Sequence, residues 1–261
     1  MTRIERSSGQ REEDLFSPEK KKPRYPYIAV IGPPGVGKSS LVEIFKDDPN
    51  FYALEELVDK NPYVGDSYQA PDGRAAFHSQ IEFRKLKIGQ RLWTKAHWRE
   101  KIPLQDTPGF EDGMYALAAY EEGRMSAADY QEYLNYHPEL EEILPTPDLV
   151  IWLKVSLRVL NTRIFKRGRD WEEAFTPFFR KRMIELCQQK AEEYEGHVLV
   201  LDTDNLDYAH TKEGITQAVK EIKTKIVEIW GDGQGTGIDG TRIILPASLI
   251  EEVESWKKTK K

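Results

Sequence analysis

The sequence contains a single cysteine, Cys187, among its 261 residues. One cysteine excludes an internal disulfide and any zinc or iron–sulfur site built from several cysteines. No stretch approaches the ~18 to 20 uninterrupted apolar residues of a membrane-spanning helix, and the N-terminus lacks the apolar segment of a secretory signal. We therefore expect a cytoplasmic protein that does not engage a membrane.

The sequence also has no excess of positively charged residues. The chain has 38 Lys and Arg against 44 Asp and Glu, a formal net charge of −6. Such a chain does not coat nucleic acid through general electrostatic attraction, so nucleic acid is not the expected partner. Hydrophobic residues make up 39% of the sequence, which is enough for a packed core. The composition predicts a globular protein, and no internal repeat is present.

A glycine-rich run between residues 32 and 39 is the strongest motif in the chain. Its pattern is Gly-x-x-x-x-Gly-Lys-Ser, preceded by an apolar run at 27–31 and followed by an amphipathic run from Ser40. This order predicts a strand, a tight phosphate-binding loop and a helix. Backbone N–H groups of such a loop surround phosphate oxygens at the positive end of the helix.

The loop predicts a nucleoside triphosphate as ligand. Lys38 is expected to reach the β- and γ-phosphates, and the Ser39 hydroxyl is expected to bind Mg²⁺. The expected nucleotide-binding residues are Gly32, Pro33, Pro34, Gly35, Val36, Gly37, Lys38, Ser39 and Ser40.

The alternation of apolar runs and helical patterns predicts an α/β fold. Expected strands are 27–31, 51–54, 102–105, 148–153 and 197–201, and expected helices are 74–93, 113–137, one carrying Arg163 to Arg169, 177–195 and 215–230. Ser126 is the expected cap of a helix from Ala127. Strands separated by helices form a parallel sheet, here five-stranded with helices on both faces.

Both ends of the chain differ in composition from the middle. Residues 1–24 are charged and end in a basic cluster, which predicts a flexible arm before a domain over 25–230. Residues 231–261 begin with a glycine-rich linker and end in an amphipathic helix, with Leu249, Ile250, Val253 and Trp256 on one face. We expect this helix to dock on the domain or on a second subunit.

Several polar residues fit phosphoryl transfer, which needs a held triphosphate, a metal, positive charge and a group that deprotonates the acceptor. Glu55 and Glu56 follow the second strand, where ligands of parallel sheets collect, and Glu56 is the candidate base. Asp106 ends the third strand and is the candidate metal-side acid beside Ser39. Arg163, Arg167 and Arg169 are expected to close over the phosphates, although a solvated basic helix face would show the same pattern.

Together with the loop, these residues resemble the deoxynucleoside kinase family, most closely its bacterial deoxyadenosine and deoxyguanosine kinase branch. The likeness runs from Tyr27 to Trp230. Its landmarks, in matching order, are Glu56-Leu57-Val58, Asn61-Pro62-Tyr63, Tyr68, Phe77-x-x-Gln80, Asp106 to Asp112, Met125-Ser126-x-x-Asp129-Tyr130, Pro147-Asp148-Leu149-Val150-Ile151, Arg167-Gly168-Arg169 and Leu201-Asp202-Thr203-Asp204.

The resemblance implies a P-loop kinase domain that uses ATP and Mg²⁺ to phosphorylate the 5′-hydroxyl of a deoxynucleoside, with a purine implied by the branch. It implies Glu56 as general base, Tyr68 at the 3′-hydroxyl, and Gln80 and Asp112 at the nucleobase. Phe77 would line the pocket, and the arginines at 163, 167 and 169 would belong to a lid. The resemblance also implies a homodimer.

The sequence departs from the family pattern after the third strand. Where the family has Asp-Arg-Ser or Glu-Arg-Ser, this chain has Asp106-Thr107-Pro108, and Arg84, Lys85 or Lys87 are candidates to replace the lost charge. A milder departure is Glu56-Leu57 in place of Glu-Pro. Asp106 to Gly109 also matches the Asp-x-x-Gly switch of GTP-hydrolysing proteins. A nucleotide-dependent switch, a non-catalytic kinase-like subunit and a kinase with a different acceptor therefore remain alternatives.

Overall fold

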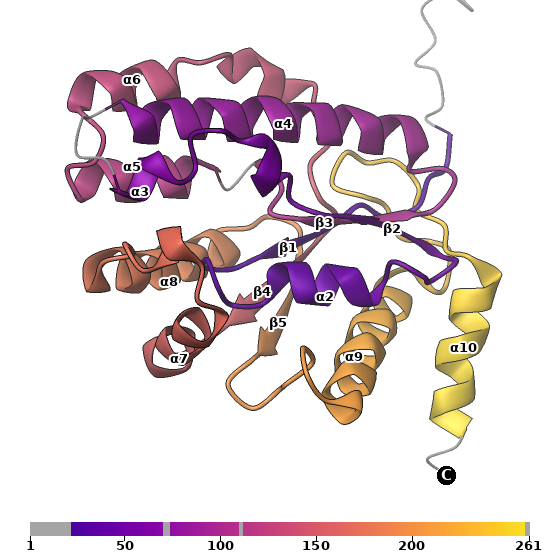
Figure 1. The fold of residues 1–261 in the computed structure, drawn as a ribbon. Coiled ribbons are helices and arrows are strands. Elements are labelled where there is room, and N and C mark those ends of the chain that lie inside the picture. Colours follow the sequence, from indigo (N-terminus) through magenta and orange to yellow (C-terminus); the bar gives the residue numbers. More distant parts are fainter. Residues whose placement is uncertain (1–21, 70–73, 110–111, 259–261) are drawn as a thin grey trace, which may run out of the picture.

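A computed structural model describes residues 22–69, 74–109 and 112–258. Within these ranges, five strands form one parallel sheet in the order β2-β3-β1-β4-β5 (Figure 1). The strands are β1 (Ile28–Ile31), β2 (Phe51–Leu54), β3 (Ile102–Asp106), β4 (Leu149–Lys154) and β5 (His197–Asp202). The predicted α/β class and the parallel sheet are confirmed.

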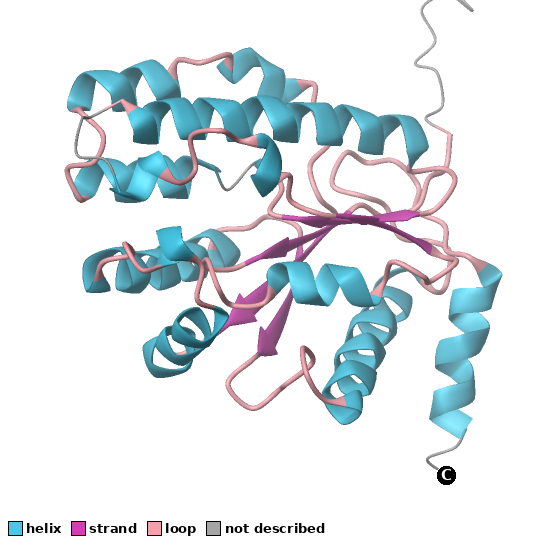
Figure 2. Cartoon of the chain, viewed as in Figure 1, coloured by secondary structure: helices cyan, strands magenta, loops and turns pink. Residues whose placement is uncertain are grey.

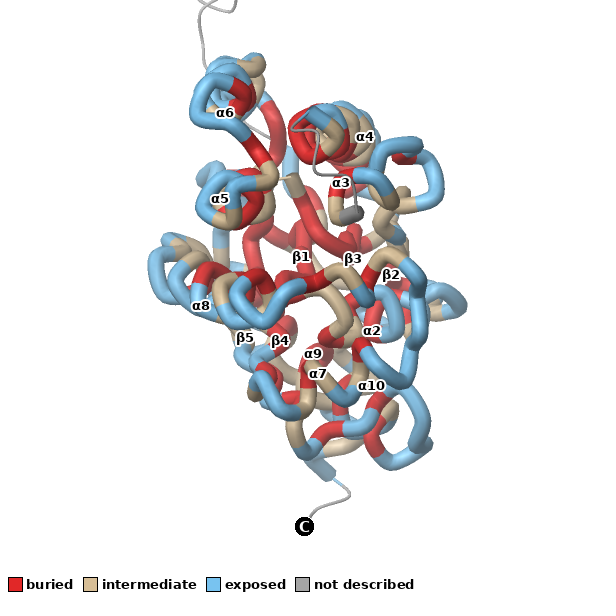
Figure 3. The backbone as a smooth tube through the Cα atoms, turned by 60° about the vertical axis from the view of Figure 1, so that its left-hand side comes forward, coloured by how far each residue is buried: buried red, intermediate tan, exposed pale blue. Residues whose placement is uncertain are grey.

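Burial explains which apolar runs became central strands. Every residue of β1 and β3 is buried, whereas β5, at the sheet edge, exposes His197 and Val200 (Figure 3). A central strand is covered on both faces and therefore reads as a continuous apolar run. An edge strand has a neighbour on one side only, so it retains solvent-facing positions.

Helices cover both faces of the sheet, as Figure 2 shows. In the view of Figure 1, α4 to α6 lie above the sheet, and α2, α7 and α9 lie below it. The helices are α2 (Lys38–Ile44), α3 (Asp66–Gln69), α4 (Ala75–His97), α5 (Asp112–Glu121), α6 (Ala127–Leu134), α7 (Leu157–Arg167), α8 (Pro177–Glu192), α9 (Lys212–Trp230) and α10 (Ala247–Lys258), with short 3₁₀ turns η1 (Val58–Lys60), η3 (Pro138–Glu142) and η4 (Asp170–Glu172).

Two predicted helices end earlier than the sequence pattern indicates. The helix predicted over 113–137 is divided into α5 and α6 near Gly123, which has a φ of 78°. The predicted cap of α6 is confirmed, because the Ser126 side chain accepts the Asp129 N–H at 3.1 Å. The helix predicted to carry Arg169 ends at Arg167, because Gly168 adopts the left-handed conformation that terminates helices.

The N-terminal boundary also differs from the prediction. The sequence places Arg24 in a flexible arm, yet its side chain is fully buried, with Nη1 2.6 Å from Asp148 Oδ2 and Nη2 2.9 Å from Asp239 Oδ1. The predicted arm otherwise lies outside the described residues, apart from Lys22 and Pro23, which are exposed. A buried guanidinium requires partners, and here they come from two distant segments.

The glycine-rich segment 231–240, predicted as a linker, is held against the domain. The Ile238 N–H donates to Asp148 Oδ1 at 2.9 Å, and Asp239 pairs with Arg24. This differs from the linker prediction because long-range hydrogen bonds fix a segment whose local sequence favours flexibility.

The C-terminal helix α10 docks on the domain, one of the two predicted outcomes. Leu249 and Val253 are buried in the core, and Lys223 of α9 lies 2.7 Å from Glu252 and 2.6 Å from Asp48. No helix in the described part of the chain is both long and apolar enough to cross a membrane.

Candidate active site

A cavity of about 860 Å³ lies beside the glycine loop. Its walls come from the loop, the residues after β2, helix α4, the segment from α7 through η4, and the turn after β5. Parallel α/β sheets collect ligands beyond the carboxyl ends of their strands, and β2 and β5 both lead into this cavity. Most of the site residues predicted from sequence meet here.

The loop owes its shape to glycines with positive φ. Gly35 has a φ of 82° and Gly37 a φ of 111°, conformations that other residues adopt only with strain. A Cβ on Gly37 would also lie 2.8 Å from the hydroxyl of Tyr208. The helix α2 begins immediately afterwards at Lys38, so its free N–H groups and its positive dipole end face the loop.

Lys38, Ser39 and Asp106 form one connected group. Lys38 is buried, and its Nζ donates to the Gly32 carbonyl at 2.8 Å across the loop. The Ser39 hydroxyl donates to Asp106 Oδ2 at 2.7 Å. One hydroxyl and one carboxylate are oxygen ligands of the kind that Mg²⁺ takes from a protein when phosphates supply the others, so this pair fits a nucleotide-bound Mg²⁺.

Arg163 lies beside the loop and holds it in place. Its Nη1 donates to the Val36 carbonyl and to the Thr203 hydroxyl, each at 2.9 Å. The Tyr208 hydroxyl donates to the Gly37 carbonyl at 3.3 Å from the same side. Arg163, predicted as a lid residue, thus links the loop to the turn that follows β5 in this conformation.

Glu56 and Glu55, adjacent in sequence, have different environments. Glu56 Oε1 lies 3.5 Å from Nζ of Lys87, a buried residue of α4, and both line the cavity. Glu55 also lines the cavity, but it pairs with Lys46 at 3.2 Å and exposes 50% of its side chain. Of the two acids, Glu56 has the partly buried position, with a cationic partner, that suits a general base.

Tyr68 of α3 forms an aromatic wall of the cavity. Its ring stacks on Trp171 at a centroid distance of 5.7 Å and meets Phe179 edge-on at 5.6 Å. Arg124 lies over the other side of the ring at 4.9 Å. Burial raises the pKa of Tyr68 to about 12, so the phenol remains a neutral hydrogen-bond donor at physiological pH.

Glu172 is a site residue that the sequence analysis did not identify. It is 1% exposed, lines the cavity, and lies 3.4 Å from Arg167 and 3.8 Å from Arg169. Burial raises the pKa of its carboxyl, and its Oε2 has no hydrogen-bond partner among the described residues. A buried oxygen of this kind at a cavity wall can accept from a ligand hydroxyl. The Arg167-Gly168-Arg169 motif was a local signal that could have drawn attention to this acid.

The predicted base-binding residues are only partly brought together. Gln80 of α4 is buried and lines the cavity. Phe77, one turn earlier, is absent from the lining and packs with Ala116 and Met125 in a separate hydrophobic cluster. Asp112 begins α5, but its side chain lies outside the described residues. The residues at 77 and 112 keep their predicted roles only as expectations.

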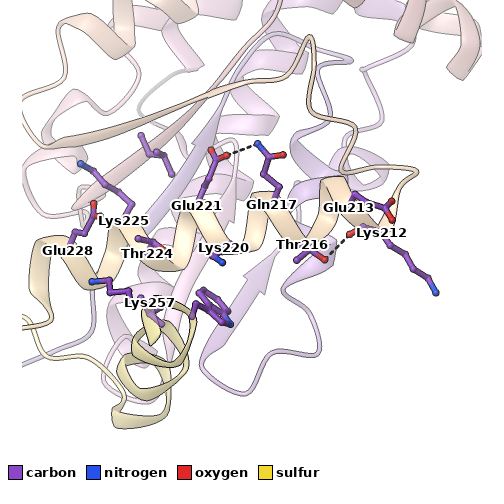
Figure 4. A pocket seen from close by; sticks show the side chains of 13 residues that line it. Lys212, Glu213, Thr216, Gln217, Lys220, Glu221, Thr224, Lys225, Glu228 and Lys257 are labelled. Atoms are coloured by element: carbon purple, nitrogen blue, oxygen red, sulfur yellow. Dashed lines mark hydrogen bonds between the residues drawn. The ribbon is translucent and has the colours of Figure 1, made fainter. Parts of the chain in front are cut away.

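A second cavity, of about 750 Å³, lies between α9 and α10, away from the glycine loop. Figure 4 shows the Lys, Glu, Thr and Gln side chains of α9 that line this cavity, and the lining also includes the apolar residues Leu199, Val253 and Trp256. Glu221 accepts a hydrogen bond from Gln217 at 2.8 Å on the same helix. These are ordinary solvated helix contacts, and the phosphate chemistry belongs to the first cavity.

Comparison with known proteins identifies the family. A family model described as deoxynucleoside kinase matches residues 28–228, which include the loop and every element around the first cavity. The chain belongs to the deoxynucleoside kinase family. It is therefore a phosphotransferase with a hydroxyl acceptor, and the switch and non-catalytic alternatives are not favoured.

Individual deoxynucleoside kinases give the same picture. The chain is 27% identical over 208 residues to a deoxyguanosine kinase of Bacillus subtilis, covering 77% of this chain and 98% of that one. It is 31% identical over 170 residues to a deoxyadenosine/deoxycytidine kinase of the same organism, covering 60% and 76%.

A solved relative confirms the fold. A deoxyadenosine kinase from M. mycoides, with the product dCMP and a flexible dCDP bound, aligns with a TM-score of 0.63 and 25% identity over 78% of this chain and 100% of that one. Its dATP-bound structure aligns with a TM-score of 0.62 and 26% identity, covering 74% and 98%.

Proposed function

We propose that this deoxynucleoside kinase transfers the γ-phosphoryl group of ATP, bound with Mg²⁺, to the 5′-hydroxyl of a purine deoxynucleoside. One observation carries the proposal: the cavity joins a phosphate-binding loop to a partly buried carboxylate, Glu56. A shared cavity allows a triphosphate on the loop and a hydroxyl beside Glu56 to be bound together, which phosphoryl transfer requires.

The donor end supports ATP. The glycine loop supplies backbone N–H groups, and Lys38 supplies a buried positive charge that would move from the Gly32 carbonyl to the phosphates. Ser39 and Asp106 would hold the Mg²⁺, which would neutralise charge on the phosphates. The M. mycoides relative has been solved with bound dATP, which supports an adenine nucleotide as ligand.

The acceptor end supports a deoxynucleoside. In the proposed arrangement, Tyr68 and Glu172 contact the sugar 3′-hydroxyl, one as donor and the other as acceptor. Gln80 of α4 is buried in the wall of the same cavity, and its amide can both donate to and accept from a purine edge. The curated relatives named for deoxyguanosine and deoxyadenosine support a purine.

The reaction then requires one proton transfer and one displacement. Glu56 accepts the proton of the 5′-hydroxyl as its oxygen bonds to the γ-phosphorus, while the bond to the β–γ bridging oxygen breaks and ADP leaves. Lys38, Arg167 and Arg169 surround the donor end of the cavity and stabilise the negative charge on the moving group.

The direct test is to incubate the protein with γ-labelled ATP and Mg²⁺ and with each common deoxynucleoside in turn. We expect label in a 5′-monophosphate, with deoxyadenosine or deoxyguanosine preferred. Labelled phosphate released equally with and without acceptor would contradict the proposal and favour a nucleotide-dependent switch. Label in a different hydroxyl compound would mean that the protein is a phosphotransferase but that its acceptor is not a deoxynucleoside.

The role of Glu56 can be tested with its neighbour as control. Glu56→Gln should lower kcat by about 10²- to 10⁴-fold, the usual contribution of a general base, while ATP affinity stays near the wild-type value. Glu55→Gln changes the same functional group one residue earlier, on a surface-exposed carboxylate that pairs with Lys46. It should leave kcat within about twofold. Wild-type turnover in Glu56→Gln would remove Glu56 from the mechanism.

A further inference from the structure

The described residues at the end of β3 supply no cation to the site. Thr107 follows Asp106, is fully buried with a φ of 51°, and donates its hydroxyl to Asp106 Oδ1 at 2.7 Å. Pro108 comes next and has neither charge nor a backbone donor. Positive charge near Glu56, the proposed general base, must therefore come from another element of the fold. Arg167 lines the same cavity and interacts electrostatically with Glu56, but it belongs to the group predicted to close over the phosphates.

The sequence offers three further candidates, all on α4, and their environments differ. Lys85 pairs with Glu82 at 3.3 Å on the same helix, with half of its side chain exposed. Arg84 lies over the ring of Tyr133 at 5.5 Å and does not line the cavity. Lys87 is 3% exposed and lines the cavity together with Glu56.

The side chain of Lys87 is buried, and its amino group lies close to one carboxylate and two aromatic rings. Its Nζ lies 3.5 Å from Glu56 Oε1, 5.3 Å from the ring centroid of Phe83 and 5.9 Å from that of Tyr115. The carboxylate and the electron-rich ring faces offset part of the desolvation cost of the charge. Hydrophobic residues in place of both members of the pair would remove that cost, so the buried pair is not explained by stability alone.

We propose that Lys87 is the positioning residue for Glu56, replacing a cation at the end of β3. The ammonium group holds the carboxylate in one orientation in the cavity and keeps it ionised, ready to accept the 5′-hydroxyl proton. This inference rests on the proposed function, because it assigns Lys87 a part in the same transfer. Lys87 acts through Glu56 and needs no contact with the substrate.

The test compares Lys87→Met, which keeps the length and apolar stem of the side chain, with Lys87→Arg, which restores a cation. Lys87→Met should lower kcat about 10- to 100-fold, the scale of a misplaced reacting group, with KM for ATP and for the deoxynucleoside within about threefold. Lys87→Arg should recover most of the lost rate. Lys85→Met, two residues away on the exposed face, is the matched control and should retain wild-type turnover.

A double variant separates positioning from simple destabilisation. If Lys87 acts through Glu56, then Glu56→Gln with Lys87→Met should be no slower than Glu56→Gln alone, because the carboxylate to be positioned is already gone. Circular dichroism and thermal unfolding check that each variant folds. If Lys87→Met does not fold, Lys87→Gln, which keeps a polar head group without the charge, takes its place in the series.

The outcomes distinguish the two proposals. An active wild type with a normal kcat in Lys87→Met overturns the role of Lys87 and leaves the proposed function standing. Effects of the two substitutions that multiply in the double variant, or no recovery in Lys87→Arg, also overturn it. A wild type that transfers no label to any acceptor overturns both proposals.

Discussion

The two ends of the proposed active site are built in different ways. The donor end is centred on nine consecutive residues, from Gly32 to Ser40, whose chemistry is largely backbone N–H groups and a helix terminus, and Asp106, Arg167 and Arg169 join it from other elements. The acceptor end is assembled from side chains of separate elements: Glu56 after β2, Tyr68 on α3, Gln80 on α4 and Glu172 on η4. A contiguous loop is specified locally, whereas the acceptor end exists only once the chain has folded.

The difference also predicts how each end responds to mutation. Few residues other than glycine adopt the backbone conformation of the phosphate loop. A substitution of a loop glycine should therefore disfavour the whole phosphate-binding conformation. Each side chain of the acceptor end provides one contact, so its loss should cost about one interaction.

Gly37→Ala, at the donor end, should have a larger effect than substitutions of Tyr68 or Glu172. The φ of 111° and the 2.8 Å approach of the new Cβ to the Tyr208 hydroxyl strain the binding conformation by about 1–3 kcal/mol. ATP affinity should fall about 10- to 100-fold, measured by titration calorimetry.

A glycine elsewhere provides the control for Gly37. A Cβ added to Gly89 of α4 would meet no heavy atom of the described residues within 4 Å, so Gly89→Ala should leave ATP affinity unchanged and stabilise the helix by about 0.5–1 kcal/mol. Tyr208→Phe removes the nearest clashing atom and should restore part of the affinity of Gly37→Ala. Full affinity in Gly37→Ala alone would show that the loop is not rigid.

Tyr68→Phe should have an intermediate effect at the acceptor end. The variant keeps the ring that stacks on Trp171 and loses the hydroxyl, so KM for the deoxynucleoside should rise up to about tenfold while KM for ATP is unchanged. Because burial raises the pKa of Tyr68 to about 12, the ratio of wild-type to variant KM should be constant between about pH 6 and pH 10. A change in KM for ATP would place this ring at the donor end instead.

Glu172→Gln should have the smallest effect, seen in the pH dependence of stability. Burial raises the pKa of this carboxyl, so the folded state holds its proton more tightly than the unfolded chain does. The neutral carboxyl of Glu172 therefore contributes fully to the folding stability of the wild type at low pH. This contribution is lost as pH rises through the raised pKa.

The measurement is thermal unfolding of wild type and Glu172→Gln between about pH 4 and pH 8. The midpoint of the variant, relative to that of the wild type, should rise with pH. A relative midpoint that instead falls as pH rises would mean that the ion pairs with Arg167 and Arg169 outweigh burial and lower the pKa of Glu172.

Local patterns predicted much of the fold. The apolar run before Gly32 was predicted as a strand and forms β1, and Ser126 has the short side-chain oxygen that caps a helix. Local patterns failed where distant partners decide. Arg24 looks like part of a solvated tail until Asp148 and Asp239 are placed beside it.

The sequence by itself determined the phosphate loop, because its glycines, lysine and serine are neighbours whose geometry follows from local backbone preferences. Through the period of its apolar residues, it also determined the succession of strands and helices along the chain. Only the tertiary structure decided which of Arg84, Lys85 and Lys87 faces Glu56, and that Glu172 joins the site. Those choices depend on contacts between elements far apart in the chain, and no local pattern encodes them.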